Sequence, residues 1–339
     1  MIALRLHDVR DLRLHDEPVR EPSPDEALLR VAAVGLCGSD LHWFAEGGIG
    51  DAVLERPLVL GHEPVAVVED GPRAGERVAV DPAIPCGRCG PCIDGDEHLC
   101  LALRFAGHGA TDGALRELMP WPERLLHPLP DSLPDAAATL LEPLGAALHA
   151  LELARLGPGA SAGVYGCGPL GLLLVQALRL AGVGVAVATD PLPHRAEAAQ
   201  ALGATSAPQT RRAGMEVLPA RLRHGLDVAF EIAGDDDAVA TALDTLRPGG
   251  LLVLVGIPAG DRTSFAASVA RRKGLTIALC RRMRPRHLER AIELAERRDL
   301  ELASLVTDRF PLARGAEAFA ALGERRGLKV VVEPQRRPV

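Results

Sequence analysis

The segment Val164-Tyr165-Gly166-Cys167-Gly168-Pro169-Leu170-Gly171 joins a short apolar stretch, residues 161–165, to a longer one, residues 170–180. Its glycines follow the pattern Gly-x-Gly-x-x-Gly between a predicted strand and a predicted helix. In that context the first glycine permits a tight turn, the second lets a pyrophosphate approach the backbone, and the third allows helix and strand to pack closely. The segment therefore predicts a dinucleotide site formed by Gly166, Gly168, Pro169, Leu170 and Gly171.

Short apolar strands and helices alternate on either side of this segment. The predicted strands are residues 161–165, 183–189, 226–230 and 251–255, and the predicted helices are residues 170–180, 195–202 and 238–246. This alternation is typical of a parallel sheet with helices on both faces. We therefore predict an α/β, doubly wound, Rossmann-type nucleotide-binding domain over residues 146–280.

The second predicted strand of this domain ends at Asp190, 24 residues after Gly166 (190 − 166). A carboxylate at this place binds the ribose hydroxyls of NAD and repels the 2′-phosphate of NADP. Alternatively, Asp190 caps the helix that follows Pro191. We expect NAD as the cofactor, while the nearby Arg195 leaves residual use of NADP open.

The chain has a different texture before residue 146. Residues 1–145 combine many Pro and Gly residues with short apolar runs, namely residues 27–34, 58–60, 65–68 and 78–80. Runs of this length joined by turns predict an irregular antiparallel β domain. Residues 281–339 hold one amphipathic helix, 288–297, and a final strand, 329–332. Spacing alone leaves open whether they extend the parallel sheet or return to the first domain.

Composition excludes several classes of function. The chain has 339 residues, of which 47% are hydrophobic, and its 38 Lys and Arg against 45 Asp and Glu give a net charge of −7. Nucleic acids and anionic membranes bind basic surfaces, so we expect neither as the main partner. No apolar run reaches the roughly 18 residues of a membrane-spanning helix, and the N-terminus lacks a signal-peptide core, so we expect a cytoplasmic protein.

Four of the seven cysteines form the cluster Cys86-x2-Cys89-x2-Cys92-x7-Cys100. Four sulfurs at this spacing can surround a tetrahedral Zn²⁺, and a closed four-sulfur site is structural because it has no open coordination position. An iron–sulfur cluster also uses four cysteines, but nothing else in the sequence suggests electron transfer. The odd number of cysteines favours metal ligands and free thiols over a disulfide framework.

Other metal-binding side chains are scattered along the first domain. Cys37 follows an apolar strand, the pair His62-Glu63 follows another, and Glu142 opens a later helical stretch. Each is unremarkable singly, since a lone Cys is usually a small buried hydrophobe. Residue types and spacing leave a second metal site open.

The whole chain resembles the zinc-dependent medium-chain alcohol dehydrogenases, in particular their sorbitol (polyol) dehydrogenase branch. The motifs follow the family's order: Cys-Gly-Ser-Asp-Leu-His at 37–42, Gly-His-Glu at 61–63, the cysteine cluster at 86–100, Leu-Glu-Pro-Leu at 141–144, the glycine motif at 166–171 and Leu-Val-Gly-Ile at 254–257. The resemblance implies a GroES-like β fold for the catalytic domain, a return of residues 281–339 to that domain, and a cofactor cleft between the two domains.

The resemblance also implies a catalytic zinc. Cys37 and His62 match two protein ligands of this ion, and the third is Glu63 or Glu142. Asp40 matches the carboxylate that orients the histidine ligand. Ser39 matches the hydroxyl that takes the proton of the substrate alcohol, and His42 matches the position that passes this proton to solvent.

Further residues are implied at the cofactor and the substrate. Val255, Gly256 and Ile257 are expected to hold the nicotinamide carboxamide through backbone groups. Trp43 and Arg281 match substrate-side positions, although a core role for Trp43 and a solvated role for Arg281 stay open. Relatives form homodimers or homotetramers through the edge strand of the nucleotide domain, which we place at residues 251–255.

The implied activity is hydride transfer from a secondary alcohol, on a polyol, sugar or cyclitol, to NAD⁺. L-threonine 3-dehydrogenase and vicinal-diol (butanediol) dehydrogenase activities are alternatives that share the metal and cofactor motifs. An alternative of another class is a non-catalytic, zinc-stabilised NAD-binding protein. Two zinc ions per chain indicate the enzyme, and a single ion in the cysteine cluster indicates the binding protein.

Overall fold

The computed structural model describes residues 1–335, so the short basic tail Arg336-Arg337-Pro338 lies outside the described residues. The chain forms two compact units. The first comprises Met1–Glu142 together with the chain from Arg284 onward, and the second is Pro143–Met283. None of the helices within residues 1–335 is long and apolar enough to cross a membrane.

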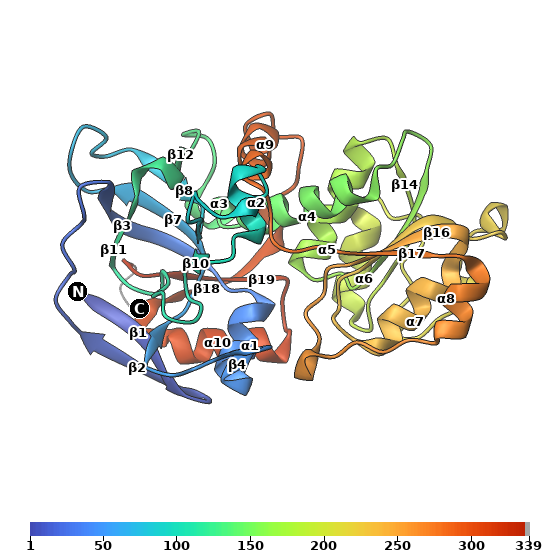
Figure 1. Cartoon of the computed structure of the whole chain (residues 1–339), viewed down its shortest axis with the longest axis horizontal. Coiled ribbons are helices and arrows are strands. Elements are labelled where there is room, and N and C mark those ends of the chain that lie inside the picture. Colours follow the sequence, from blue (N-terminus) through green and yellow to red (C-terminus); the bar gives the residue numbers. More distant parts are fainter. Residues whose placement is uncertain (336–339) are drawn as a thin grey trace. The chain divides into compact units, whose positions relative to one another are not determined.

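The first unit is built on a seven-stranded sheet with the order β12-β8-β7-β3-β19-β18, in which β11 also pairs with β3. Its strands are β3 (Glu26–Gly35), β7 (Glu63–Val68), β8 (Arg77–Val80), β11 (Leu118–Pro122), β12 (Leu126–Pro128), β18 (Val306–Pro311) and β19 (Lys329–Glu333). All pairs are antiparallel except β18 with β19. In Figure 1 the red strand β19 lies beside the blue β3, and β18 is the next strand after β19, so the end of the chain completes the sheet that its beginning starts.

Smaller elements surround this sheet. Strands β1 (Ile2–Asp8), β2 (Asp11–Asp16) and β6 (Leu58–Val59) form a three-stranded sheet, and the pairs β4 (Gly48–Ile49) with β5 (Ala52–Val53) and β9 (Ala83–Ile84) with β10 (Arg104–Phe105) are short ribbons. The helices are α1 (Gly38–Glu46), α2 (Gly90–Ile93), α3 (Asp135–Ala138), α9 (Pro285–Glu296) and α10 (Gly315–Glu324). Buried side chains of the seven-stranded sheet, the three-stranded sheet, α1 and α10 form one apolar core, which includes Trp43 and Phe319.

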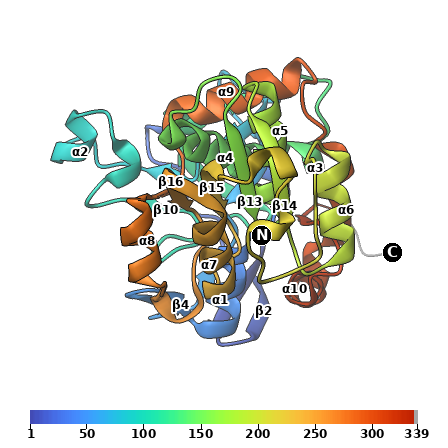
Figure 2. The same cartoon turned by 90° about the vertical axis from the view of Figure 1, so that its right-hand side faces the viewer.

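The second unit contains a five-stranded parallel sheet with the order β14-β13-β15-β16-β17. The strands are β13 (Ser161–Tyr165), β14 (Gly184–Thr189), β15 (Leu226–Glu231), β16 (Leu246–Leu254) and β17 (Thr276–Leu279). Helices α5 (Pro169–Leu180) and α6 (Pro193–Ala201) contact β14, and α7 (Asp236–Thr245) and α8 (Ala267–Lys273) contact β16. Figure 2 shows these pairs on opposite faces of the sheet, as the alternating sequence pattern predicts. Helix α4 (Leu141–Ala154) joins the two parts of the chain.

One expectation about this sheet is wrong. We placed its edge at residues 251–255, but β16 lies between β15 and β17, and the edge strand is β17. The apolar run of β16 reflects burial between neighbouring strands, which looks the same in sequence as an apolar edge. Strand β17 has only four residues and no alternation of buried and exposed positions, so periodicity does not reveal it.

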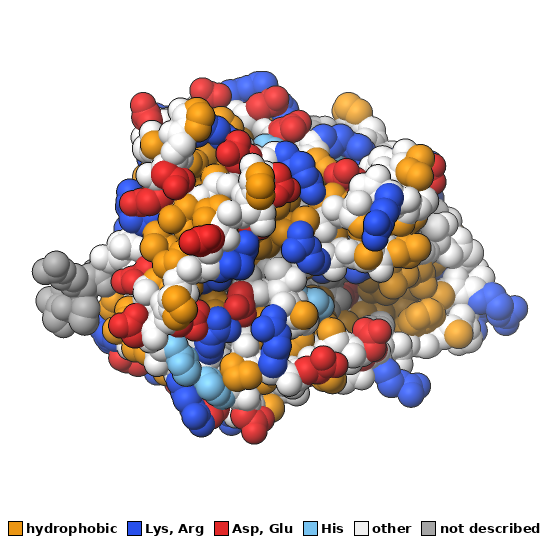
Figure 3. Space-filling view, turned by 60° about the vertical axis from the view of Figure 1, so that its left-hand side comes forward, with side chains coloured by type: hydrophobic (Ala, Val, Ile, Leu, Met, Phe, Trp, Pro, Cys, Tyr) orange, Lys and Arg blue, Asp and Glu red, His pale blue; other side chains and the backbone are white. Residues whose placement is uncertain are grey.

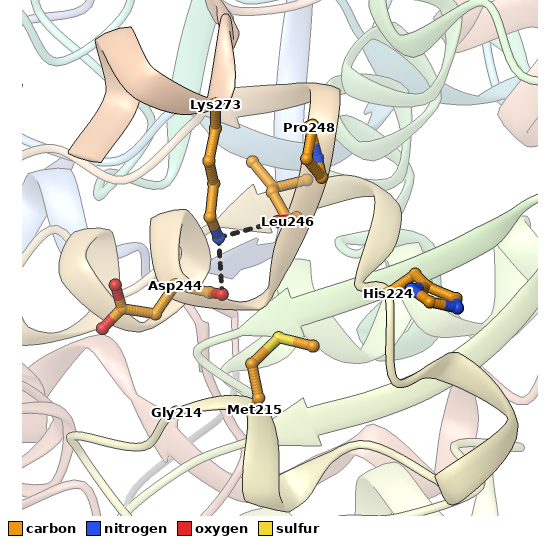
Figure 4. Close-up of a pocket in the computed structure, with 7 residues that line it drawn as sticks. All are labelled: Gly214, Met215, His224, Asp244, Leu246, Pro248 and Lys273. Atoms are coloured by element: carbon orange, nitrogen blue, oxygen red, sulfur yellow. Dashed lines mark hydrogen bonds between the residues drawn. The ribbon is translucent and has the colours of Figure 1, made fainter.

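The end of α7 is capped by Lys273, which lines a shallow surface pocket (Figure 4). The Lys273 Nζ donates hydrogen bonds to the carbonyl oxygens of Leu243, Asp244 and Leu246 at 2.7–2.8 Å. The last carbonyls of a helix lack partners within it, so this ammonium satisfies them. An ammonium has three donors, so all three are used within the fold rather than offered to a ligand.

Charged side chains of both signs are interspersed over the face of the molecule seen in Figure 3. Several form ion pairs within the first unit, such as Arg30 with Glu69 and Arg314 with Glu317, at 2.9 and 2.6 Å. Pairs this exposed contribute little to stability. The mixture agrees with the net charge of −7.

Candidate functional site

Cys37 stands at the N-terminus of helix α1. Strand β3 ends at Gly35, and Cys37 has extended backbone angles (φ −110°, ψ 162°) as the residue that precedes the helix. Its backbone N–H donates to the Asp40 Oδ2 at 2.9 Å. This bond fixes the turn between strand and helix, so the Cys37 side chain leaves the chain at a defined place.

His62 is placed by a turn that requires glycine. Gly61 has φ +93°, and a Cβ on it would lie 2.8 Å from the Val34 Cγ1. The backbone N–H of Gly61 donates to the Asp40 Oδ1 at 3.0 Å, and the same oxygen lies 3.3 Å from the His62 Nδ1. Asp40 thus links the start of α1 to the His62 turn and leaves the other ring nitrogen, Nε2, to face away from it.

The Asp40–His62 pair is buried, with side-chain exposures of 1% and 8%. Burial opposes ionisation of Asp40, but the charge of His62 and the N–H groups of Cys37 and Gly61 hold the pKa of this carboxyl below its usual value. Burial also lowers the pKa of His62, but the Asp40 carboxylate outweighs it and raises this pKa well above the usual value. A carboxylate that holds an imidazole in this way is the usual partner of a metal-binding histidine.

Glu63 is completely buried, and its carboxylate lies close to the side chains of Cys37 and His62. Its Oε2 forms an ion pair with the Nζ of Lys329 on β19, and this nitrogen also donates to the Leu36 carbonyl at 3.0 Å. Gly35 makes room for the pair, because a Cβ there would lie 2.7 Å from the Lys329 Cε. The Glu63 Oε1 has no hydrogen-bond partner within residues 1–335. A buried oxygen of this kind is costly unless something binds it.

Ligand atoms of Cys37, His62 and Glu63 lie within 4.8 Å of one another. Thiolate, imidazole and carboxylate are the three ligand types of zinc in proteins, so the trio fits that ion. Glu142, the other expected carboxylate, is not part of this group. Burial raises its pKa to about 7; the nearby Glu63 also raises it, and His62 opposes the shift. Of the two alternatives for a third ligand, the geometry favours Glu63.

The four cysteines of the predicted structural site also converge. The sulfur atoms of the four residues all lie within 4.8 Å of one another, namely those of Cys86, Cys89, Cys92 and Cys100. The backbone N–H of Cys86 donates to the Cys100 sulfur at 3.2 Å. Backbone N–H groups of Arg88 and Cys89 lower the pKa of Cys86 to about 6, which favours the thiolate that binds zinc. The cluster fits a closed four-sulfur zinc site.

The residues expected to carry a proton lie on α1 or next to it. The Ser39 hydroxyl is 3.3 Å from the His62 Nε2, and the His42 Nδ1 is 2.8 Å from the Glu46 Oε1, one turn further along α1.

Trp43 is 1% exposed, and its indole N–H donates to the His108 Nδ1 at 3.1 Å. This burial agrees with the core role considered for Trp43, and the substrate contact stays a prediction.

The three glycines of the dinucleotide motif differ in what they permit. Gly166 has φ +109°, and a Cβ on Gly171 would lie 2.0 Å from the Gly166 carbonyl oxygen. A Cβ on Gly168 would meet only the Arg195 Nη1, at 3.7 Å. The first glycine therefore makes the turn, the third lets α5 pack against it, and the second leaves its backbone open to a pyrophosphate. Pro169 and Leu170 begin α5.

Asp190 follows β14 and is 5% exposed. Its Oδ2 accepts from the Cys167 N–H and its Oδ1 from the Leu192 N–H, each at 2.9 Å. The carboxylate therefore fixes the glycine loop as well as the residues after its own strand. Each carboxylate oxygen has a second lone pair, so ribose hydroxyls can still donate to it.

Val255 and Gly256 follow β16 and donate their N–H groups to the Glu231 carbonyl at 2.9 and 3.1 Å. A ligand at this segment therefore has the carbonyl oxygens and the N–H of Ile257 to bind. The Ile257 side chain is 43% exposed. Arg281 is also exposed and belongs to the second unit, whereas the Cys37 trio belongs to the first.

Sequence reasoning missed Lys329 and Glu46. The sequence did hold a signal for the first, because Lys329 and Lys273 are the only lysines among the 38 basic residues Lys and Arg. Lys329 donates to a carboxylate and a carbonyl in a narrow space, and Lys273 donates to three carbonyls. A compact ammonium fits both places, and a planar guanidinium does not.

Two family matches cover most of the chain. Residues 23–131 match the family described as alcohol dehydrogenase GroES-like domain, and residues 169–297 match the family described as zinc-binding dehydrogenase. The chain is 34% identical to a sorbitol dehydrogenase of Bacillus subtilis, over 99% of this chain and 98% of that protein.

Solved structures agree with these matches. The crystal structure of L-idonate 5-dehydrogenase from Escherichia coli is similar with a TM-score of 0.90 and 25% identity, over 98% of this chain and 97% of that one. The structure of 2R,3R-butanediol dehydrogenase from Bacillus subtilis is similar with a TM-score of 0.86 and 27% identity, over 98% of this chain and 99% of that one.

Proposed function

The chain belongs to the zinc-dependent medium-chain alcohol dehydrogenases, and on this premise we propose that it transfers a hydride from a secondary hydroxyl of a polyol, sugar or cyclitol to NAD⁺. The observation that carries the proposal is the convergence of Cys37, His62 and Glu63. The proteins it resembles act on sorbitol, idonate and butanediol, as their names say. All three substrates carry a secondary hydroxyl beside another oxygen-bearing carbon.

Cys37, His62 and Glu63 would hold the catalytic zinc, with Glu142 as a nearby carboxylate that can take the place of Glu63. When bound, the zinc ion supplies a positive charge that lowers the pKa of a hydroxyl beside it. The unpartnered Glu63 Oε1 supports this assignment, because a metal ion would satisfy it. Cys86, Cys89, Cys92 and Cys100 would hold a second, structural ion.

Ser39 and His42 would move the proton of the substrate alcohol. The Ser39 hydroxyl lies beside the metal-facing nitrogen of His62, so it is within reach of a hydroxyl that binds there. His42 lies one helical turn further along α1, where a side-chain exposure of 20% gives it access to solvent. Glu46 fixes the His42 ring through its Nδ1, which leaves Nε2 to exchange the proton.

The glycine loop, Asp190 and residues 255–257 would hold the dinucleotide. Gly168 leaves the backbone open for the pyrophosphate at the start of α5, where helical N–H groups favour an anion. Asp190 would accept from the ribose hydroxyls, and Arg195, whose guanidinium lies beside Gly168, would face the phosphates. Val255, Gly256 and Ile257 would hold the carboxamide. NAD supplies the acceptor carbon for the hydride.

Butanediol dehydrogenase activity is the second candidate, because the solved butanediol dehydrogenase matches this chain over almost its full length. The two candidates share the metal and cofactor residues and differ in the length of the substrate. Threonine remains a third substrate to test, and Arg281 would serve a charged substrate such as a sugar acid.

We also propose a cytoplasmic homodimer or homotetramer without nucleic-acid or membrane partners. Strand β17 supports pairing between subunits, because it is an edge strand and its Leu279 is 77% exposed. Edge strands of this kind offer unpaired backbone groups to another chain.

The proposed activity is tested by NADH formation with a panel of polyols, sugar acids, vicinal diols and threonine. We expect turnover with secondary alcohols that carry a neighbouring hydroxyl, and two zinc ions per chain. A protein that binds NADH and holds one zinc ion in the cysteine cluster, without turnover on the panel, would instead be the non-catalytic binding protein.

A further inference from the structure

A buried carboxylate in the second unit has no part in the function proposed above. Glu231 is the last residue of β15 and is 2% exposed. Its Oε1 accepts from the Gly234 N–H at 2.6 Å, and the N–H groups of Ala233 and Asp235 also stabilise the carboxylate. Successive backbone N–H groups of a turn can together bind one anion. The Glu231 side chain thus fixes the shape of residues 232–235.

The main chain of Glu231 holds the segment at the end of the next strand. Its carbonyl oxygen accepts from the N–H groups of Val255 and Gly256 at 2.9 and 3.1 Å. One residue is therefore bonded both to its own turn and to the segment expected to hold the nicotinamide carboxamide. Movement of Glu231 would shift both.

The turn and the segment are in direct backbone contact. A Cβ on Gly256 would lie 2.2 Å from the Gly234 nitrogen, and a Cβ on Gly234 would lie 2.3 Å from the Ile257 carbonyl oxygen. No side chain fits at either position. The two glycines let the carboxyl ends of β15 and β16 touch, and the position of one determines that of the other.

The other side of the same turn contacts the glycine loop. A Cβ on Gly166 would lie 2.7 Å from the Ala233 nitrogen, and the Tyr165 carbonyl accepts from the Ile232 N–H at 2.8 Å. The turn after β15 therefore lies between the loop expected to bind the pyrophosphate and the segment expected to bind the nicotinamide.

We propose that Glu231 is a positioning residue for the cofactor: it sets the separation between the glycine loop and residues 255–257, so that one dinucleotide meets both in register. The inference rests on the proposed function, because both half-sites belong to it. A preorganised spacing increases affinity because the bound ligand does not have to order the two segments.

The position of Glu231 is costly for the fold, which supports a functional reason for it. Burial raises the pKa of Glu231 to about 7, and the neighbouring Asp235 adds to the rise, although the N–H of Gly234 opposes it. Asp235 is itself 3.8 Å from Arg211. Residues that destabilise the fold locally are often found at functional sites.

The test compares the wild type with E231Q and with E152Q, a matched control that changes an exposed glutamate on α4 of the same unit. Binding of NADH and of ADP-ribose, which lacks the nicotinamide, is measured by calorimetry at pH 8. In E231Q one carboxylate oxygen becomes an NH2 group that cannot accept from the backbone N–H groups of the turn, and the charge is lost. We therefore expect E231Q to weaken NADH binding by at least about tenfold, and ADP-ribose binding by less than about threefold. E152Q should match the wild type for both ligands.

G256A provides a second variant that keeps the charge of Glu231, because its added methyl group would press against the Gly234 nitrogen and the Glu231 Oε2 and so separate the turn from residues 255–257. It should show the same selective loss of NADH affinity. Unchanged NADH affinity in E231Q, or an equal loss for NADH and ADP-ribose, would overturn the positioning role. A wild type that binds neither ligand would instead refute the proposed function.

Discussion

Lys329 and Glu63 form a completely buried ion pair although they are 266 positions apart in the chain. The pair joins β19, the last strand, to the beginning of β7, beside the candidate catalytic metal site. Lys329 holds one carboxylate oxygen of Glu63 and leaves the other without a partner within residues 1–335. The final strand thereby orients a proposed metal ligand near the other end of the sequence.

Replacing Lys329 by methionine should destabilise the first unit. The variant leaves a buried carboxylate without its counter-charge, which typically costs about 3–5 kcal/mol. Urea unfolding of K329M measures the loss. The double variant K329M/E63Q removes both charges and should recover part of the stability. A K329M variant as stable as the wild type would show that the pair does not hold this region together.

The two proposed zinc sites should be separable by mutation. C37S should lower the zinc content from two ions per chain to one and abolish turnover, while its melting temperature changes little. C89S should also lose one ion, but with a clear fall in melting temperature because a structural site contributes directly to folding. Elemental analysis and thermal denaturation give both readings. C280S, a change outside both groups, should keep two ions.

Loss of His42 should affect turnover most at low pH. If His42 passes the substrate proton to solvent, H42A must rely on solvent bases, which become scarce as the pH falls. We expect the rate of H42A to approach that of the wild type above about pH 9 and to fall well below it near neutrality. An identical pH–rate profile would refute the relay. E46Q, which weakens the hold on the ring, should show a smaller change in the same direction.

Asp190 should set the preference for NAD over NADP. D190S removes the carboxylate that accepts from the ribose hydroxyls and repels a 2′-phosphate. We expect kcat/KM for NAD to fall by roughly 10- to 100-fold, in line with the loss of charge-assisted hydrogen bonds worth about 1.5–3 kcal/mol. Use of NADP should rise relative to NAD. Because Asp190 also holds the Cys167 N–H, circular dichroism is needed to show that the fold is retained.

The stability of the protein should respond to the charge of Glu231 with a defined sign. Its pKa rises from 4.5 to about 7 on folding, so the folded state binds the proton more tightly than the unfolded state. This contribution to stability is present below pH 4.5 and is lost as the pH rises toward 7.

The Gln side chain of E231Q cannot ionise, so this variant does not lose stability in this way as the pH rises. Between pH 4.5 and 8 the free energy of unfolding of E231Q should therefore rise relative to the wild type by as much as about 3 kcal/mol. Urea unfolding of the cofactor-free protein at several pH values measures the trend. A constant difference across this range would show that Glu231 ionises with an ordinary pKa.

Local sequence patterns predict the second unit well because its strands, helices and turns depend on residues that are close together in the chain. Residues 161–165 were predicted as a strand and form β13, and the helix predicted from residue 170 begins one residue earlier. The glycine spacing indicated a turn between them because Gly166 has a positive φ and Gly171 lies against it. The cysteine spacing likewise indicated a compact four-sulfur cluster.

Other features left weak signals in the sequence. Strand β18 and helix α10 were not predicted, and the sequence left open whether Trp43 contacts the substrate or only packs in the core, where it lies. The hydrogen-bond partner of its indole is His108, which is 65 positions away in the chain. A side chain's burial depends on which distant segments pack on it, and no local pattern states that.

Within residues 1–335, some features depend on residues close together in the chain, and others depend on contacts between distant segments. Local sequence patterns were enough to predict the alternating strands and helices of the second unit, the glycine turn and the sulfur cluster, because each depends on residues close together in the chain. The tertiary structure was needed to show that the last strand pairs with β3, that the Glu63 carboxylate lies close to Cys37 and His62, and that Lys329 binds this carboxylate. Those relationships depend on strand pairing between the two ends of the chain. Many pairing registers would bury the apolar residues equally well until the whole core is packed.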